Sequence, residues 1–270
     1  MRNIMHLRIP YHIRLTVQDF FKGLFLGTLG IQYRLRQHLK DQNRSYSKEE
    51  RYTQGYFYQG LEEIGITGAK PTGFRFSQYE VDNLLRNSDI LDIGSNAGFV
   101  ACYCALKGAA SITAVELNPY LNRIANDTAK FFKLKNVKVI ESDFSRFFTD
   151  HKFDIILSLS NHHTIDGKFF LPFDQYIEKI SNLLKPDGYL LFESHNVFAA
   201  GTGGVGDDGD MELKIQIMNR FFEIKRFRMV KCYLKHGVED LDKLFVVAQK
   251  NSKPKSVHFC LSEAIGKYHW

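Results

Sequence analysis

The sequence predicts an α/β fold built on a doubly wound, mostly parallel sheet of seven strands, with an antiparallel C-terminal strand and an N-terminal helical extension. Two observations carry this prediction. From about residue 76, short apolar runs rich in branched residues alternate with stretches of helical periodicity. The last two runs follow one another without a helix between them, which indicates antiparallel pairing.

Seven runs are expected as strands because each is short, apolar and bounded by turn residues. In chain order they are DILDI (89–93), SITAVE (111–116), VKVIE (137–141), FDIILSLS (153–160), YLLFES (189–194), FFEIKRFRMV (221–230) and DKLFVVAQK (242–250). Asn118 and Pro119 suit the cap and first turn of a helix. A second helix begins near Phe173 and stops before Pro186, and a short one is expected at 210–220.

Length and composition limit the class of protein. The chain has 270 residues, of which 44% are hydrophobic and 24% charged, so disordered and fibrous classes are excluded and one or two domains fit. We expect a helical extension and ligand cover at 1–75, the sheet domain at 76–250 and a tail at 251–270. The four cysteines show no CxxC spacing, which favours a reduced, cytoplasmic compartment.

Positive charge is concentrated at the N-terminus. Residues 1–44 hold eight Lys or Arg and two Asp, a net +6 that equals the net charge of the whole chain. Asp19 and Lys22 interrupt the apolar stretch of this segment, so it is no clean membrane span. Its large apolar residues recur at roughly helical spacing: Phe20, Phe21, Leu24, Phe25 and Leu29. The pattern predicts contact with an anionic membrane surface or a partner, and the alternative is a helix docked on its own domain.

The carboxyl ends of the first three expected strands carry a glycine turn and two acids. In an open sheet of this kind, ligands bind at these ends, near the point where the strand order reverses. Gly94 and Gly98 bracket a turn in LDIGSNAGF (91–99), Glu116 lies 22 residues beyond Gly94, and Asp143 follows the third strand. A carboxylate at the second strand end can accept from ribose hydroxyls, and Asp143 could accept from an adenine amino group. The sequence therefore predicts a nucleoside site.

Asp92 discriminates between the two nucleoside cofactors that compete for such a site. It stands two positions before Gly94, where a dinucleotide would bring a pyrophosphate that a carboxylate repels. S-adenosylmethionine instead brings an ammonium and a sulfonium, which an acidic strand end tolerates well. The turn after the first strand also lacks the pattern G-x-G-x-x-G. We therefore expect S-adenosylmethionine, with a glycine turn that binds no ligand as the alternative.

The stretch from about 89 to 195 resembles the class I S-adenosylmethionine-dependent methyltransferases, a Rossmann-like family. LDIGSNAGF, AVELNPY and ESDF carry the resemblance. It implies a set of cofactor-binding residues: Asp92, Gly94, Ser95, Asn96, Gly98, Glu116, Leu117, Asp143 and Phe144. Asn96 stands where the family has its middle glycine, so it must take the turn conformation with a side chain present. Asparagine tolerates left-handed backbone angles better than most residues.

Three further segments resemble a narrower group, the methyltransferases that modify bacterial surface-glycan termini, among them O-antigen chain-terminating enzymes. The segments are AKPTGFRF before the first strand, LSLSNHHTIDG after the fourth and LLFESHN at the fifth. The resemblance implies that Thr72 and Arg75 lie on a segment folded over the cofactor and adds Ser160 to the cofactor-binding set. Arg75 is then a partner for the methionine carboxylate, and the alternative is a surface charge.

Three histidines and a glutamate follow the fourth and fifth strands: His162, His163, Glu193 and His195. Methyl transfer from a sulfonium is an in-line displacement, so the protein mainly positions the acceptor, and a hydroxyl acceptor also benefits from a general base. We interpret these four residues as the catalytic, acceptor-side group. A metal site and a polar network that orients loops are the alternatives.

The sequence thus predicts S-adenosylmethionine-dependent methyl transfer to a small-molecule or glycan acceptor, at a hydroxyl or phosphate oxygen. The enzyme is expected in the cytoplasm, with residues 1–44 as its contact to the inner face of the membrane. RNA methylation is the main alternative because of the basic N-terminus, although no recognisable RNA-binding module is present. A non-catalytic, membrane-associated protein that binds S-adenosylmethionine is the second alternative.

Overall fold

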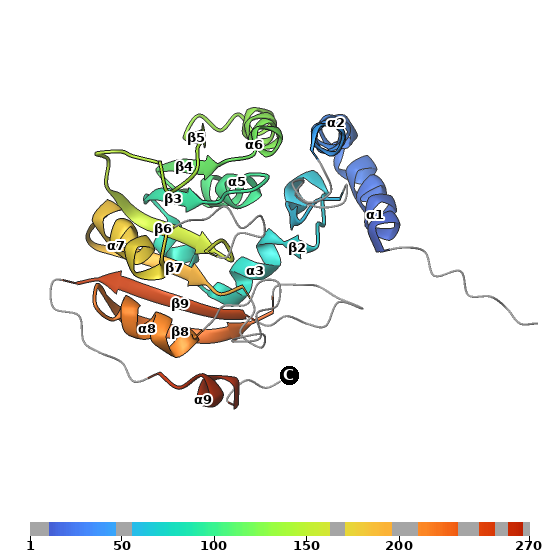
Figure 1. Cartoon of the computed structure of the whole chain (residues 1–270). Helices are drawn as coiled ribbons and strands as arrows, with labels where there is room; N and C mark the ends of the chain where they lie inside the picture. Colours follow the sequence, from blue (N-terminus) through green and yellow to red (C-terminus); the bar gives the residue numbers. More distant parts are fainter. Residues whose placement is uncertain are drawn as a thin grey trace, which may run out of the picture.

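One seven-stranded sheet organises the molecule (Figure 1). The computed structural model describes residues 11–46, 56–162, 171–195, 210–231, 243–251 and 259–266. The strands are β3 (Asp89–Ile93), β4 (Ser111–Glu116), β5 (Val137–Glu141), β6 (Phe153–Leu159), β7 (Leu184–Glu193), β8 (Phe222–Val230) and β9 (Lys243–Lys250). Their spatial order is β5-β4-β3-β6-β7-β9-β8. Neighbours from β5 to β7 are parallel, and β9 is antiparallel to both β7 and β8, so the predicted fold is confirmed.

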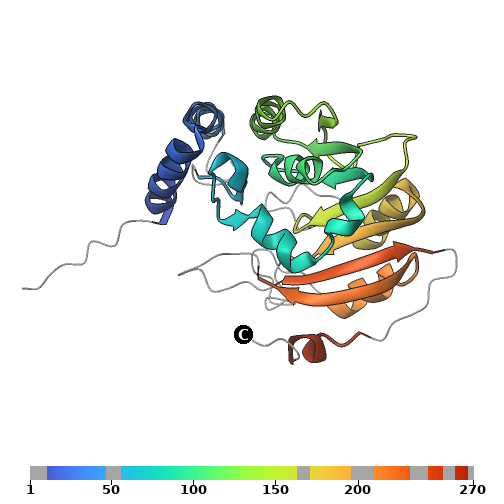
Figure 2. The same cartoon turned by 180° about the vertical axis from the view of Figure 1, so that it is seen from behind.

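Helices cover both faces of this sheet, which Figures 1 and 2 show from opposite sides. On one face the core is shared with α3, α5 and α6, and on the other with α7 and α8. The helices of the sheet domain are α3 (Thr72–Tyr79), α4 (Asp82–Leu85), α5 (Phe99–Leu106), α6 (Pro119–Phe131), α7 (Phe173–Leu183) and α8 (Met211–Met218), and α9 (Leu261–Gly266) lies in the predicted tail.

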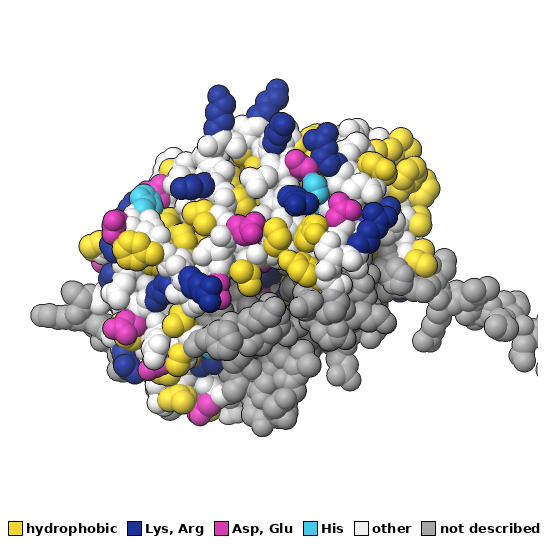
Figure 3. Space-filling model, turned by 45° about the horizontal axis from the view of Figure 1, so that its top comes forward, with side chains coloured by type: hydrophobic (Ala, Val, Ile, Leu, Met, Phe, Trp, Pro, Cys, Tyr) yellow, Lys and Arg dark blue, Asp and Glu magenta, His cyan; other side chains and the backbone are white. Residues whose placement is uncertain are grey.

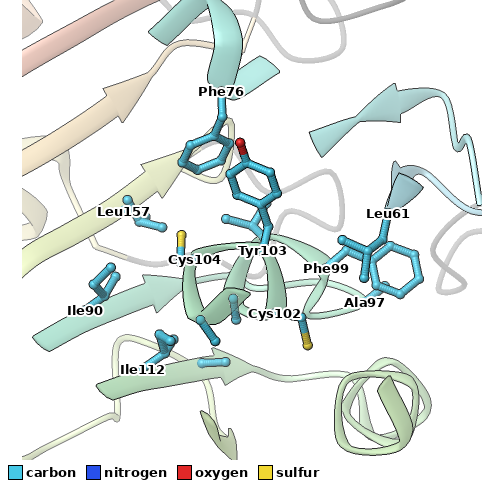
Figure 4. Close-up of a cluster of buried hydrophobic side chains, with 14 of the residues drawn as sticks. Leu61, Phe76, Ile90, Ala97, Phe99, Cys102, Tyr103, Cys104, Ile112 and Leu157 are labelled. Carbon is cyan, nitrogen blue, oxygen red and sulfur yellow. The ribbon is translucent and has the colours of Figure 1, made fainter. Parts of the chain in front are cut away.

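The strands divide their side chains between two cores because successive residues point to opposite faces. Ile90 joins the cluster on the α5 side, whereas its neighbour Leu91 joins the cluster on the α7 side. Figure 4 shows part of the first cluster, in which Cys102 and Cys104 of α5 are buried beside the sheet as free thiols. Burial raises the pKa of the Cys104 thiol well above its usual value, which fits a core residue better than a reactive one.

The first helix after β4 begins where the sequence predicts. The side-chain oxygen of Asn118 accepts hydrogen bonds from the backbone N–H groups of Tyr120 at 2.9 Å and Leu121 at 3.3 Å. Pro119 occupies the first turn of α6, where its missing N–H costs nothing. These contacts satisfy the first donors of α6 and fix the turn that follows Glu116.

β7 is longer than predicted. α7 ends at Leu183, before Pro186 as predicted, but β7 begins at once at Leu184 rather than at residue 189. The register shifts on β6 between Phe153 and Ile155, where Phe153 pairs with Leu184 and Ile155 with Tyr189. The intervening residues of β7 include Pro186, so this part of the strand departs from regular pairing, as a residue without a backbone N–H requires.

The N-terminal extension contains two helices rather than one continuous helix. They are α1 (Tyr11–Leu26) and α2 (Leu29–Ser45), followed by the small parallel sheet of β1 (Gln59–Gly60) and β2 (Lys70–Pro71) with the 3-10 helix η1 (Glu62–Ile64) between them. Gly27, with a φ of 69°, separates the two helices, so Leu29 starts α2 and does not extend the apolar pattern of α1. None of the described helices combines the length and the apolar character that a bilayer span requires. The boundary predicted after residue 75 falls inside α3.

Polar groups fasten α1 to the rest of the domain. Asp19 is buried, and its carboxylate accepts from the backbone N–H of Thr67 at 2.9 Å and from Arg36 of α2 at 2.9 Å. The amide of Gln32 donates to the carbonyl oxygens of Asp19 at 3.0 Å and Ile64 at 2.8 Å. α1 is thus docked on the chain's own domain through its polar side.

The last strand also holds the segment that follows β7. The backbone N–H of Ser194 donates to Leu244 O at 2.9 Å, and the N–H of Leu244 donates to Ser194 Oγ at 2.9 Å. The ammonium of the fully buried Lys243 donates to the carbonyl oxygen of His195. The start of β9 therefore fixes the chain immediately beyond Glu193.

We expect Asp19→Ala to lower the free energy of unfolding of the α1 region by about 1 to 3 kcal/mol, because it leaves the Thr67 N–H and the Arg36 guanidinium without their acceptor in a buried site. Asp41→Ala is the matched control, since the Asp41–Arg44 pair is exposed and its atoms are 3.6 Å apart. Hydrogen exchange of the α1 amides measures the effect. Equal protection in the two variants would contradict this account of how α1 is docked.

Candidate functional site

The turn after β3 brings three left-handed residues to the carboxyl edge of the sheet. Gly94, Asn96 and Gly98 have φ values of 62°, 55° and 68°. Asn96 therefore takes the left-handed conformation that the sequence predicts for it. A Cβ on Gly98 would lie 2.3 Å from Cβ of Ala125, so only glycine lets α5 start this close to α6. The turn holds the N-terminus of α5 at the edge of the sheet.

Two buried polar atoms beside this turn have no hydrogen-bond partner among the described residues. They are Oδ2 of Asp92, a residue 3% exposed, and Oγ of Ser95. Burial raises the pKa of Asp92 to about 7, although the nearby charge of Arg75 lowers it, and the carboxylate of Glu116 adds to the rise. A buried acceptor without a donor is costly, so this pair fits a ligand that brings hydrogen-bond donors and positive charge.

Backbone amides orient Glu116 at the end of β4. Its Oε2 accepts from the N–H of Asn96 at 2.8 Å and its Oε1 from the N–H of Asn118 at 2.9 Å. The carboxylate is thus held between the glycine turn and the start of α6. An ionised carboxylate accepts about four hydrogen bonds, and these two backbone donors fix its orientation. It is suited to a pair of hydroxyl groups.

The residues predicted around the adenine part of the site separate into two kinds. Oδ1 of Asp143 accepts from the N–H of Ser145 at 2.7 Å, so the carboxylate shapes the turn beyond β5. Leu117 is exposed beside Glu116 and offers apolar surface. The ring of Phe144, by contrast, is buried in the core, 5.5 Å from the ring of Tyr176. Phe144 therefore supports the floor of the site with its side chain.

A buried polar network joins α3 to the ends of β6 and β7. Arg75 donates from Nη2 to Oε1 of Glu193 at 2.9 Å and from Nε to the hydroxyl of Tyr79 at 3.1 Å. The Tyr79 hydroxyl donates to the other carboxylate oxygen of Glu193, and the Ser160 hydroxyl donates to Oε1. Arg75 is 1% exposed and Glu193 equally so, which sets Arg75 apart from an ordinary surface charge. Ser160, with a φ of 57°, adopts a strained backbone at this point.

Asn161 links the two halves of the site, and sequence reasoning did not select it. Its amide donates to the carbonyl oxygen of Ile93, the last residue of β3, and its oxygen accepts from Ser158 at 2.8 Å and Tyr176 at 3.1 Å. Because β3 and β6 are neighbours, Asn161 sits at the point where the strand order reverses. A Cβ on Gly94 would lie 3.1 Å from Cβ of Asn161. Tyr79 was missed as well, although its position one helical turn after Arg75 was a readable signal.

The predicted acceptor-side histidines are described only in part. His162 follows β6, with its ring 4.7 Å from the ring of Phe173 and 5.1 Å from that of Tyr176. His195 follows Glu193 on β7, and His163 lies outside the described residues. Within the ranges that the structure describes, no three His, Cys, Asp or Glu side chains gather closely enough to hold a metal ion.

The site thus has two regions along one edge of the sheet. Asp92 and Glu116 stand with the glycine turn on β3 and β4, and Glu193 stands with Arg75 at β6 and β7. These three carboxylates outnumber the single guanidinium of Arg75, so this edge of the sheet has an acidic character that favours a cationic ligand. A surface depression at the amino ends of β4 and β5, which includes His151 in its lining, is remote from this edge.

We expect the stability of the protein to fall as the pH rises from about 3.8 to about 7, the window between the pKa of Asp92 in the unfolded chain and its raised pKa in the folded protein. Between pH 3.8 and about 7 the folded protein keeps a proton that the unfolded chain has released, so the stabilising contribution of neutral Asp92 is lost across that window. Asp92→Asn should therefore raise the melting temperature at pH 8 and change it less at pH 5. Asp82→Asn, at an exposed position of α4, is the control. A gain that is the same at both pH values would contradict the raised pKa.

Comparison with known proteins agrees with this geometry. Residues 91–192 match the sequence model of a family described as "Methyltransferase domain". A protein of Methanocaldococcus jannaschii provisionally assigned as a protein N5-glutamine methyltransferase is 32% identical over 120 residues, which are 38% of this chain and 60% of that protein. The release factor glutamine methyltransferase of Shewanella oneidensis is 31% identical over 128 residues, or 40% of this chain and 45% of that protein. The chain thus spans about half the length of these curated relatives.

Solved structures of the same fold extend over more of the chain. The N-methyltransferase NodS of Bradyrhizobium japonicum, in complex with S-adenosyl-L-homocysteine, has a TM-score of 0.56 and 18% identity, covering 80% of this chain and 98% of its own. A SAM-dependent methyltransferase of Methanosarcina mazei has a TM-score of 0.51 and 19% identity, covering 64% and 97%. The predicted Rossmann-like fold is confirmed, and the match of residues 91–192 to a methyltransferase domain agrees with the predicted class and cofactor.

Proposed function

We propose that the whole chain transfers the methyl group of S-adenosylmethionine to an acceptor held at the ends of β6 and β7. One observation carries the proposal: Asp92 Oδ2 and Ser95 Oγ are buried without a described partner beside the glycine turn. S-adenosylmethionine has the charge and the donors that such a pair requires, since its ammonium donates hydrogen bonds and its sulfonium adds a second positive charge. A neutral or anionic nucleotide would leave the Asp92 carboxylate uncompensated.

Each region of the site then has a task. Glu116 accepts from the two ribose hydroxyls, Asp143 accepts from the adenine amino group, and Leu117 covers the adenine ring. Arg75 pairs with the methionine carboxylate, and Glu193 orients its guanidinium through the hydrogen bond at 2.9 Å. Glu193 accepts from three side chains, so in this proposal it positions Arg75 and Ser160 on the acceptor side rather than removing a proton.

The reaction is a displacement at the methyl carbon. A lone pair of the acceptor forms a bond to this carbon, the bond from carbon to sulfur breaks, and its electron pair returns to sulfur, giving neutral S-adenosylhomocysteine. A hydroxyl acceptor must also lose its proton, for which His162, His163 and His195 are the candidate bases. A phosphate acceptor has no such need, and positive charge suffices to hold it.

We assign the acceptor to the small-molecule or glycan class, with an oxygen as the methylated atom. The histidines support this choice because a hydroxyl is the acceptor that gains most from a neutral imidazole. The resemblance of three segments to glycan-terminus methyltransferases points the same way. The four cysteines without CxxC spacing favour a cytoplasmic location.

A glutamine side chain of a protein is the second candidate, because both curated relatives carry that activity in their names. A planar amide needs a partner that both donates and accepts. Asn161 is the described amide side chain at the end of β6. It already donates to Ile93 and accepts from Ser158 and Tyr176. This occupation makes a glutamine acceptor the less favoured of the two.

Labelled S-adenosylmethionine separates the acceptors directly. The full chain is incubated with fractionated lysate, and label is measured in glycolipid, protein, RNA and small molecules. We expect label in glycolipid or small molecules. Label in protein would establish the glutamine alternative, label in RNA would establish the nucleic-acid alternative, and binding without turnover in any fraction would overturn the enzymatic proposal.

We expect Glu116→Ala to weaken S-adenosylhomocysteine binding by roughly tenfold to a hundredfold, since each lost charged hydrogen bond costs about 1.5 to 3 kcal/mol. Glu141→Ala is the matched control, because Glu141 pairs with Glu116 in the β4–β5 register but is exposed. Calorimetry measures both affinities. Tight binding of a nicotinamide dinucleotide by the unaltered chain, with none of S-adenosylmethionine, would refute the cofactor assignment in the site.

We expect His162→Ala and His163→Ala to keep cofactor affinity and to lower the rate of methylation, by roughly a hundredfold or more for the residue that acts as the base. His151→Ala is the control, because His151 lies at the amino ends of the strands. For the unaltered enzyme the rate should rise with pH near about 6.5, and this rise should flatten in the variant that lacks the base. Loss of cofactor binding in both variants would instead mark the histidines as structural.

A further inference from the structure

α1 carries an exposed apolar stripe. The stripe consists of Ile13, Val17, Phe20, Phe21, Leu24 and Phe25, whose exposed fractions run from 44% to 91%. Their spacing of three and four residues places them along one side of the helix for its whole length. Figure 3 shows hydrophobic side chains gathered on the side of the molecule where α1 and α2 lie. Soluble proteins rarely leave such a contiguous row uncovered.

The orientation of α1 is fixed by its other side. Leu15 and Asp19 are buried, and Asp19 is held by Thr67 and Arg36. Lys22 also faces inward and donates to the Thr67 hydroxyl at 2.9 Å. The charges that interrupt the apolar pattern therefore dock the helix, and the stripe cannot turn toward the domain without breaking these bonds.

The surface around the stripe is basic. α1 and α2 together hold six Lys or Arg and two Asp. Asp19 is buried and paired with Arg36, and Asp41 is paired with Arg44. Arg14 on α1 and Arg34 on α2 are exposed. The helical pair thus combines an exposed apolar stripe on α1 with an exposed cation on each helix.

A second copy of the chain is a poorer occupant than a lipid surface. The stripe offers six side chains, whereas a stable protein interface uses about 20 to 30 residues on each side. Pairing two copies would also bring together two helical pairs, α1 and α2 of each copy, of net charge +4. A bilayer surface needs only one helix lying flat, with its apolar side in the acyl boundary and its cations among anionic headgroups.

We propose that the α1 stripe docks on an anionic lipid bilayer, with α1 lying in the plane of the interface. The inference is independent of methyl transfer, since it uses no residue of the proposed site. The proposal specifies which side of α1 makes the membrane contact predicted for residues 1–44 and how the helix lies on the bilayer.

Flotation of the full chain with vesicles tests the proposal. Vesicles of phosphatidylcholine are compared with vesicles that also contain phosphatidylglycerol. The unaltered chain should float with the anionic vesicles, and Phe21→Glu with Phe25→Glu should reduce its partition by about a hundredfold or more. Phe148→Glu, at a position 82% exposed outside α1, is the matched control and should leave the partition unchanged. Arg14→Gln with Arg34→Gln should reduce binding to anionic vesicles by about fivefold for each charge.

Cofactor affinity and thermal unfolding of the variants establish that each is folded. Absence of the unaltered chain from both kinds of vesicle overturns the proposal. The second copy is the occupant instead if the chain does not float with vesicles but sediments as a dimer without lipid. Phe21→Glu with Phe25→Glu should then abolish this dimer. Nucleic acid is the partner of the basic surface if the chain does not float but binds RNA in a salt-sensitive way, and if this binding survives the loss of the two phenylalanines.

Discussion

The buried ion pair between Arg75 and Glu193 fixes how the N-terminal part of the chain meets the sheet. Both side chains are almost fully buried, so removing either one leaves an uncompensated charge, a change that typically costs about 3 to 5 kcal/mol. Through this pair α3 is bound to the end of β7, and Ser160 at the end of β6 is bound to the same carboxylate. The positive charge of Arg75 also reaches Asp92 on β3 and opposes the rise of its pKa. One interaction therefore links α3, the end of β3 and the ends of β6 and β7.

Local patterns in the sequence were enough for the sheet and for several turns. The Asn118 cap and the left-handed Asn96 depend only on near neighbours, so their sequence signals were complete. The role of Asn161 depends on β3 lying beside β6. The first residues of these strands are 64 positions apart, and the strands become adjacent only once the sheet has formed. The Arg75–Glu193 pair joins residues 118 apart in the chain. Asp19 and Lys22 were read as interruptions of an apolar segment, because the sequence does not reveal which side of a helix meets the protein.

The two regions of the site need different kinds of rigidity. On the β3 and β4 side, backbone amides and left-handed turn residues define the position of the turn and of the Glu116 carboxylate, so side-chain motion has little effect on this geometry. On the β6 and β7 side, a network of hydrogen-bonded side chains defines the positions of its own residues, so a change in one of these side chains alters its neighbours. Asn161 joins the two sides because it donates to β3 and accepts from β6 and α7. In the proposed reaction the methyl donor and the acceptor must lie in line, and Asn161 is the residue that connects the two regions assigned to them.

The position of β9 has a consequence for the order in which the protein can assemble. β9 is the last of the described strands along the chain, yet it lies between β7 and β8 in the sheet. During synthesis β8 emerges before β9, which is its only described strand neighbour. Until β9 emerges, β8 has no described strand to pair with, and the edge of β7 that binds β9 is unpaired. The N–H of Ser194 gains its acceptor on Leu244, and the carbonyl oxygen of His195 gains the Lys243 ammonium, only when β9 arrives. The chain just beyond Glu193 is therefore fixed only after β9 has been synthesised, whereas β3, β4, β5 and β6 have all emerged earlier.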